Sequence, residues 1–307
     1  MSIDIAASHQ KRLGCSNIAQ AMGLSRWGTA YQLWERYTGR AAPPDIGNEL
    51  RVALGEPMEH VLRPFVAERL GRELRRDRRE YLHPSIPLIG HVDYRASALN
   101  GEPHPVVDMK TSLGFGARVR FGEDGTDEVD PDVFLQMQGY CLLTGAALAY
   151  VAALVPGPEL KIYPIPADPD LHAMIEEGVA RFWWHVHTDT PPAITTLPDA
   201  ARRWPAETLD AIPADPQTLS LLTCYRQTQT ELKVLAARAD ELELELKLRL
   251  KEHEAFLGPD GGPVCTWKAQ SSPRLDATRM KSEAPDIYAA YSKTTTSRVF
   301  RLSKLKD

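Results

Sequence analysis

The sequence predicts an α/β protein in which helices flank a compact mixed sheet, followed by a long helix and a β-hairpin. Helical and strand-like periods alternate from residue 16 to residue 188. A Pro-rich stretch comes next, and residues 216–256 are then rich in Leu, Glu, Lys, Arg and Ala. The order helix, strands, helix, strands, helix is typical of an α/β core. With 307 residues, of which 43% are hydrophobic, the chain can form one large domain with an appendage.

Three helices are expected at the start of this core. Ser16 is a candidate N-cap of the first, and Gly39 is expected to end the second. The third is predicted at about 47–70, with Gly71 ending it. Its apolar stripe consists of Met58, Val61, Leu62, Phe65, Val66 and Leu70. The tryptophans expected to pack in the core from helical stripes are Trp27, Trp34, Trp183 and Trp184.

The period changes after residue 80. Two short apolar runs within 80–112 flank a turn signal of Asn-Gly plus Pro, which predicts two adjacent antiparallel strands. A helix is predicted at about 131–145, because Pro131 suits its first turn and Gly145 suits its end. Two more strands, "AALAYVAALVP" and "ELKIYPIPA", and a long amphipathic helix, "PDLHAMIEEGVARFWWHVHT", complete the core.

The chain is therefore divided into a core at 1–190, a Pro-rich linker at 191–215 and a C-terminal extension at 216–307. The extension begins with a segment, 216–256, that would span about 60 Å if helical. Its "LELELKLRL" alternates like a strand, but the scarcity of β-branched residues there favours a helix. The runs "VCTWKA" and "SRVFRL" predict a terminal hairpin around a short helix at "DIYAAY".

Composition excludes several classes of protein. The sequence has no run of 18 apolar residues and no charged-then-apolar leader, so we expect a cytoplasmic protein. Its four cysteines contain no C-x-x-C pair, which argues against a zinc ribbon or a disulfide framework. The net charge of -5 disfavours a nucleic-acid partner, but seven arginines lie between Arg63 and Arg79. This run indicates either contact with DNA or a solvated helix face.

Two aspartates follow apolar runs and are expected at or near strand ends. Asp93 follows "IPLIGHV", and Asp108 follows "PVV" and precedes Lys110 by two residues. In a strand, Asp108 and Lys110 would share one face while Met109 points into the core. Carboxylates that converge from neighbouring strands can bind Mg²⁺, and Glu59 on the preceding helix could add another. Taken alone, D-x-K is a weak signal that also fits a surface ion pair.

The wider order of motifs resembles the PD-(D/E)xK nuclease superfamily. An acid on a helix is followed by an aspartate, a turn, two hydrophobic residues with D-x-K, and a helix that contains "QMQGY". "LGCSNIAQAMGLSRWGTAYQLWERYTG", "ALGEPMEHVLRPFVAERLG", "VVDMKTS" and "VFLQMQGYCLLTG" further resemble YqaJ-type viral recombinases, which are alkaline exonucleases related to lambda exonuclease. The segment from "TWKAQSSPRLD" to "SRVFRL" is similar to the C-terminal module of longer members. This resemblance implies a restriction-endonuclease-like core.

The resemblance also implies roles for the acidic cluster. Asp93 and Asp108 would be metal ligands, and the Met109 carbonyl is a possible additional one. Glu59, four residues after a glycine as in the family's G-x-x-x-E helix, would contact the metal directly or through water. Lys110 would be the catalytic lysine that assists the attacking water. The implied cofactor is Mg²⁺, with Mn²⁺ as a substitute.

Further positions match the family's contacts to DNA. Gln136 matches the glutamine that orients DNA or water, and Arg12 and Ser16 fall where the family holds the 5′-terminal phosphate. The sequence departs from the family pattern at Val92, which replaces the proline of the superfamily name. His91 stands where relatives often have a small or hydroxyl residue, and it fits either a structural role or a phosphate contact.

The function implied is a metal-dependent exonuclease that digests double-stranded DNA from a 5′ end and leaves a 3′ single strand. The partners implied are double-stranded DNA ends, a single-strand annealing protein and further copies of the chain in a trimeric ring. One alternative is an endonuclease or single-strand nuclease with the same site. Another is an inactive DNA-binding or scaffold protein that uses the nuclease fold, although the intact Asp93, Asp108 and Lys110 argue against it.

Overall fold

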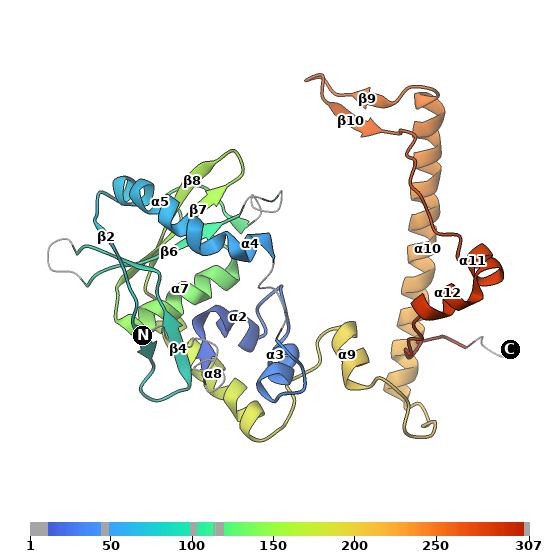
Figure 1. The fold of residues 1–307 in the computed structure, drawn as a ribbon. Coiled ribbons are helices and arrows are strands. Elements are labelled where there is room, and N and C mark those ends of the chain that lie inside the picture. The colour runs from blue at the N-terminus through green and yellow to red at the C-terminus, as the bar shows by residue number, and fades with distance from the viewer. Residues whose placement is uncertain (1–11, 44–48, 99–102, 113, 115–119, 304–307) are drawn as a thin grey trace. The chain divides into compact units, whose positions relative to one another are not determined.

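The computed structural model describes residues 12–43, 49–98, 103–112, 114 and 120–303 (Figure 1). The chain forms two compact units, Met1–Arg203 and Trp204–Asp307. Across the described residues, no helix has both the length and the apolar character needed to cross a membrane.

The first unit contains two sheets and seven α-helices among its described residues. Its strands are β1 (Leu13–Gly14), β2 (Leu74–Arg76), β3 (Glu80–Leu82), β4 (Leu88–His91), β5 (Tyr94–Ala96), β6 (Val106–Thr111), β7 (Leu148–Val155) and β8 (Glu159–Pro166). Its helices are the 3-10 turn η1 (Cys15–Asn17), α2 (Ile18–Ala21), α3 (Ala30–Tyr37), α4 (Leu50–Ala53), α5 (Gly55–Leu70), α7 (Pro131–Thr144), α8 (Pro169–His187) and α9 (Leu197–Arg203).

The central sheet is mixed, as predicted. Its five strands follow the order β2-β5-β6-β7-β8. Only β6 and β7 run parallel, because the connection between them contains α7, and the other neighbours are antiparallel. A smaller sheet has the order β1-β4-β3. The predicted class, a mixed sheet flanked by helices, is confirmed.

Helices cover both faces of the central sheet (Figure 1). On one face α5 buries a cluster that includes Leu62, Val66, Val107 and Met109. The opposite face packs against α7, with α2, α3 and α8 continuing the larger core around it. Because both faces of β6 are buried, a charged side chain on this strand needs a compensating partner.

Two predicted helix boundaries are confirmed for α7. Pro131 is its first residue, and the Asp130 carboxylate accepts a hydrogen bond from the Asp132 amide at 3.1 Å. Gly145 ends it with a φ of 68°, a left-handed conformation that suits glycine. The long helix α8 and the antiparallel pair β7–β8 also lie where the sequence places them.

The N-terminal predictions need correction. Ser16 lies inside η1 and caps no helix, and α2 has only four residues. Trp34 and Trp183 are buried as expected, but Trp27 is 64% exposed and Trp184 is 54% exposed. Trp27 lies in the loop between α2 and α3 and not on a helix, and Trp184 lies on the solvent side of α8.

The third helix and the first strands are also divided more finely than predicted. The helix expected at 47–70 is two helices, α4 and α5, and Val61 and Phe65 of its stripe are exposed because only the row of Leu62 and Val66 faces the sheet. The apolar run after residue 80 contains β3, β4 and β5, interrupted by prolines and by Asp93. Strand β2 was not predicted, since its sequence is Leu-Arg-Arg. The expected Asn-Gly turn lies outside the described residues.

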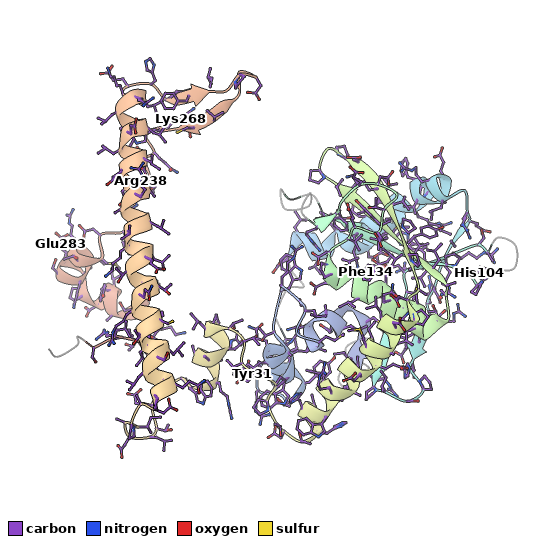
Figure 2. All side chains as sticks on the ribbon, turned by 180° about the vertical axis from the view of Figure 1, so that it is seen from behind. Tyr31, His104, Phe134, Arg238, Lys268 and Glu283 are labelled. Atoms are coloured by element: carbon purple, nitrogen blue, oxygen red, sulfur yellow. The ribbon has the colours of Figure 1, made fainter. Side chains whose placement is uncertain are left out.

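The second unit contains α10 (Pro216–Leu250), β9 (Ala255–Leu257), β10 (Pro263–Thr266), α11 (Ala277–Glu283) and α12 (Pro285–Tyr291). The helical prediction for α10 is confirmed, and its side chains extend into solvent along its length (Figure 2). The predicted β-hairpin after the long helix is present, but its partner strand was predicted wrongly, because β10 pairs with β9 and 297–302 form no strand. The predicted linker contains α9 and the division between the units.

Candidate active site

The register of β5 and β6 brings the two aspartates together. These strands are antiparallel, with Tyr94 opposite Val107. One step further along each strand, Asp93 therefore lies opposite Asp108, with both side chains on the same face. The Met109 backbone N–H also donates a hydrogen bond to the Asp93 carboxylate. Two carboxylates that are 15 positions apart in sequence thus share one small volume.

Lys110 lies on the same face of β6 as Asp108. Its Nζ atom is 2.8 Å from Oδ2 of Asp108 in an ion pair. The Asp108 side chain is 2% exposed and that of Lys110 is 29% exposed, so the ammonium group lies between the buried carboxylate and solvent. Met109 points to the opposite face and packs in the α5 cluster, as strand alternation predicts.

Glu59 belongs to α5, which packs against β6. It is half-buried, and burial raises its pKa, with the Asp108 carboxylate adding to the effect. Arg76 and Lys110 lower the pKa of Glu59 but do not cancel the increase. The helix thus brings a third carboxylate within electrostatic reach of Asp108 and Lys110.

Neighbouring carboxylates destabilise the charged forms of Asp93 and Glu59. Burial raises the pKa of Asp93 to about 8, with Asp108 and Glu59 contributing further. Burial by itself lowers the pKa of Lys110, but the carboxylates, Asp108 first, raise it above its ordinary value. One ammonium group does not balance three carboxylates at this position, which leaves room for additional positive charge.

Two of the other predicted residues, Gln136 and Ser16, lie beside Lys110. Gln136 is buried in α7 and donates a hydrogen bond from Nε2 to the Tyr140 hydroxyl at 2.9 Å. Gln136, Lys110 and Ser16 line one cavity of about 350 Å³. Arg12 lines a different cavity, next to the loop that contains Pro87. The structure therefore groups Ser16, but not Arg12, with the lysine.

The cavity of Ser16 also contains residues that sequence analysis did not assign. Arg120 lies 5.3 Å from the ring centre of Trp27, and both residues line the cavity. The Arg120 Nε atom donates to Asp130 at 3.0 Å, and Arg26 pairs with the same buried carboxylate. Asp130 is the N-cap residue of α7, but no local sequence pattern links it to these two arginines. His91 is on β4, where its Nε2 atom lies 3.3 Å from Oε2 of Glu80 on the paired strand β3.

The cluster fits a divalent cation of the Mg²⁺ kind. Its side-chain donors are all oxygens, and apart from the ion pair with Lys110 the buried Oδ2 of Asp108 receives no hydrogen bond from the described residues. Among those residues, no three His, Cys, Asp or Glu side chains form a ready-made metal-binding group. Mg²⁺ is commonly bound through one or two carboxylates, waters and substrate phosphates. Asp93 and Asp108 supply two such carboxylates, and Glu59 lies within electrostatic reach of Asp108.

Fold and cluster together define a mixed α/β protein with a carboxylate–lysine centre where β5 meets β6. Residues 6–147 match the model of a family described as "YqaJ-like viral recombinase domain". The resemblance predicted from the sequence is therefore confirmed over this part of the chain. Every position that the resemblance assigns to the site lies within the matched residues.

Individual proteins match a larger part of the chain than the family model does, at sequence identities of 25% or less. The protein YqaJ of Bacillus subtilis (strain 168), described as uncharacterized, is 25% identical over 305 residues, which cover 96% of this chain and 92% of that protein. An alkaline exonuclease from Laribacter hongkongensis has a TM-score of 0.46 at 13% identity, covering 60% of this chain and 91% of its own. A phage related exonuclease from Haemophilus somnus 129PT has a TM-score of 0.45 at 13% identity, covering 58% and 96%.

The raised pKa of Asp93 predicts how the metal-free protein depends on pH. A carboxyl group whose folded pKa exceeds its unfolded pKa stabilises the fold most at low pH, and this contribution is lost as pH rises. In EDTA, the thermal midpoint should therefore decrease between about pH 4 and pH 8, the latter being the pKa that burial gives Asp93. Asp93→Asn should remove part of this decrease, on the order of 5 °C, in thermal unfolding followed by circular dichroism.

The difference between the two proteins is the relevant quantity, since other carboxylates titrate in both. Asp170→Asn, at the exposed first turn of α8, provides a control whose thermal midpoint should decrease with pH in parallel with that of wild type. If the thermal midpoint of Asp93→Asn also decreased in parallel with that of wild type, the charged form of Asp93 would not be destabilised in the fold.

Proposed function

We propose that this protein is a metal-dependent nuclease that digests double-stranded DNA from a 5′ end and leaves a 3′ single strand. The observation that carries the proposal is the meeting of Asp93, Asp108 and Lys110 on one face of the central sheet. The match of residues 6–147 to a viral recombinase domain supports the same class of activity. A single-strand annealing partner, a ring of three copies and a cytoplasmic location belong to the proposal.

Each residue has a chemical role that its position allows. Asp93 and Asp108 would hold Mg²⁺ or Mn²⁺, with Glu59 as an outer partner and the Met109 carbonyl as a further candidate ligand. The cation would neutralise the scissile phosphate and stabilise charge on the leaving oxygen. Lys110 is partly exposed and would position the attacking water by donating a hydrogen bond to it.

The cavity beside Lys110 would receive the end of the DNA strand. Ser16 lines it at the chain segment that leads into α2, and a hydroxyl can donate to a terminal phosphate. Gln136 lines it from α7 and would orient the strand or the water. Arg12 remains a proposed phosphate contact, although its own cavity is a different one.

Nuclease assays of two variants test the proposal. On a 5′-phosphorylated linear duplex with Mg²⁺, Asp108→Asn and Lys110→Ala should each reduce kcat by about a hundredfold or more, because each removes a group that acts on the reacting phosphate. Both variants should retain most of their affinity for DNA. Glu177→Gln, which changes an exposed ion pair on α8, should keep wild-type activity.

The outcomes separate the rival functions. Hydrolysis of the linear duplex with survival of covalently closed circles supports an exonuclease, whereas cleavage of the circles would assign an endonuclease. Duplex binding without any release of nucleotides in Mg²⁺ or Mn²⁺ would assign a DNA-binding protein. An unchanged rate in Asp108→Asn or Lys110→Ala would show that the acid cluster is not the active site.

A second prediction concerns the 5′-phosphate. A hydrogen bond to a charged group contributes about 1.5–3 kcal/mol, so Ser16→Ala should lower kcat/KM on 5′-phosphorylated ends by roughly tenfold or more. Activity on 5′-hydroxyl ends should stay unchanged. The ratio of the two rates is the measurement, and Ser282→Ala on α11 of the second unit is the control.

Arg12→Gln belongs in the same experiment. An effect of both variants on the ratio supports a phosphate held by Arg12 and Ser16 together. An effect of Ser16→Ala alone would remove Arg12 from the site. An equal loss on both kinds of end would mean that Ser16 does not distinguish a terminal phosphate.

A further inference from the structure

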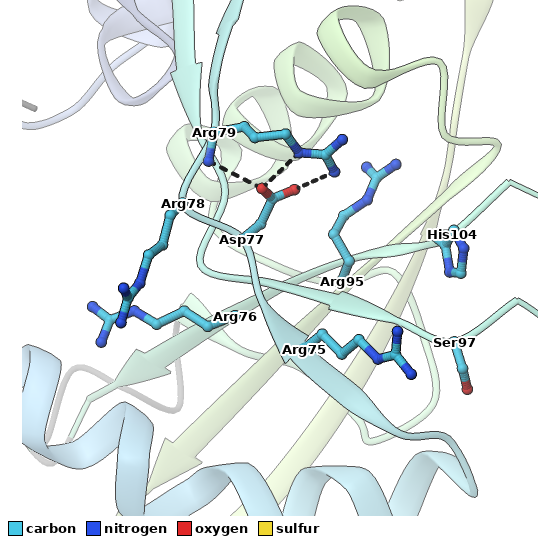
Figure 3. Close-up of a pocket in the computed structure, with 8 residues that line it drawn as sticks. All are labelled: Arg75, Arg76, Asp77, Arg78, Arg79, Arg95, Ser97 and His104. Carbon is cyan, nitrogen blue, oxygen red and sulfur yellow. Dashed lines mark hydrogen bonds and ion pairs between the residues drawn. The ribbon is translucent and has the colours of Figure 1, made fainter. Parts of the chain in front are cut away.

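Arginines line a cavity of about 460 Å³ beside the edge strand β2 (Figure 3). Its basic lining consists of Arg75, Arg76, Arg78, Arg79, Arg95 and His104. Among the described residues that line it, Asp77 alone is acidic. The lining belongs to β2, the turn after it, β5 and the approach to β6. The arginine run at this point is therefore not a solvated helix face, which was one interpretation of the sequence.

The strand register places two of these arginines directly opposite each other. β2 pairs antiparallel with β5, and Arg75 lies opposite Arg95. Residues opposite each other in this pairing project to the same face, and like charges there are destabilising. A bound anion would remove this cost.

Several of the arginines have acidic partners. Arg79 pairs with Asp77 at 2.9 Å, and Figure 3 shows this pair next to the side chain of Arg95. Arg75 pairs with Glu73 at 3.1 Å, but both side chains are mostly exposed. Such exposed pairs contribute little to stability, so a phosphate can replace the carboxylate at low cost.

Two arginines have no acidic partner in the part of the chain that the structure describes. Arg78 forms no ion pair there. Arg95 is only half-exposed, and its Nε and Nη1 atoms are buried without a hydrogen-bond partner. Buried guanidinium donors that lack acceptors are costly, which favours an acceptor from outside the chain.

The cavity and the acidic cluster lie close together along the chain at the start of β5. Arg95 follows Asp93 by two residues, so both side chains project from the same face and lie about 7 Å apart along the chain. A polyanion that reaches Asp93 and Asp108 would therefore pass next to Arg95 and Arg75. Guanidinium groups match phosphate oxygens in two-point contacts, which favours a phosphodiester backbone over a carboxylate-bearing peptide.

We propose that the arginine-lined cavity between β2 and β5 is a second phosphate site, which binds internal phosphates of duplex DNA next to the acidic cluster. The proposal rests on the proposed nuclease function for its substrate. The site does not recognise a strand end, in contrast to the cavity of Ser16. It would position the duplex without contacting the reacting phosphate.

Binding measured without cleavage tests this site. In EDTA, fluorescence anisotropy across a range of NaCl concentrations would compare wild type with Arg75→Gln/Arg78→Gln, which changes two exposed arginines. At physiological salt the double variant should bind about tenfold more weakly, and its slope of log K against log salt should be smaller by about 1 to 2. The loss should be equal for linear duplex and for covalently closed circles. Arg181→Gln on α8 should match wild type.

Steady-state cleavage of the 5′-phosphorylated linear duplex completes the experiment. The double variant should raise KM and leave kcat within about twofold, because its arginines contact only non-reacting phosphates. An affinity and salt slope equal to those of Arg181→Gln would overturn the proposal. A loss limited to 5′-phosphorylated ends would also overturn it, by making the cavity an end site. Because binding needs no hydrolysis, an inactive wild type would refute the nuclease function without deciding this point.

Discussion

The antiparallel pairing of β5 with β6 is the interaction on which the rest of the site depends. It places Asp93 opposite Asp108 on a sheet that helices cover on both faces. Burial and the Asp108 carboxylate oppose the ionisation of Asp93, and the ammonium group of Lys110 offsets only part of this cost. The fold is thus arranged around a local excess of negative charge, which is the condition that attracts a divalent cation.

The packing around this pair explains why the excess persists. α5 covers the face to which Met109 points, and α7 covers the face of Asp108 and Lys110. Both helices hold the strands in register through apolar contacts, so the carboxylates cannot separate without loss of buried surface. The pairing of β2 with β5 gathers positive charge instead, since it places Arg75 opposite Arg95. Acidic and basic groups are thus adjacent along one face.

Sequence patterns predicted the parts that depend on local rules. The start of α7 at Pro131 and the strand alternation of Asp108, Met109 and Lys110 follow from backbone geometry alone, and the structure has both. The grouping of Asp93 with Asp108 followed from a family motif. Patterns failed where tertiary packing decides: the exposure of Trp27 and the strand formed by Leu-Arg-Arg both depend on which neighbours lie across the sheet or helix. No local signal links Arg120 to Asp130, because their contact forms only in the folded chain.

Direct binding of Mn²⁺ tests the central claim most directly. Electron paramagnetic resonance of the full-length protein would measure free and bound Mn²⁺ at increasing pH, since Asp93 has a pKa of about 8 in the metal-free fold. We expect saturable binding that strengthens between pH 6 and pH 8 as protons leave the cluster. Asp108→Asn should abolish it. Binding that is absent in the wild type, or that is unaffected by Asp108→Asn, would contradict the account.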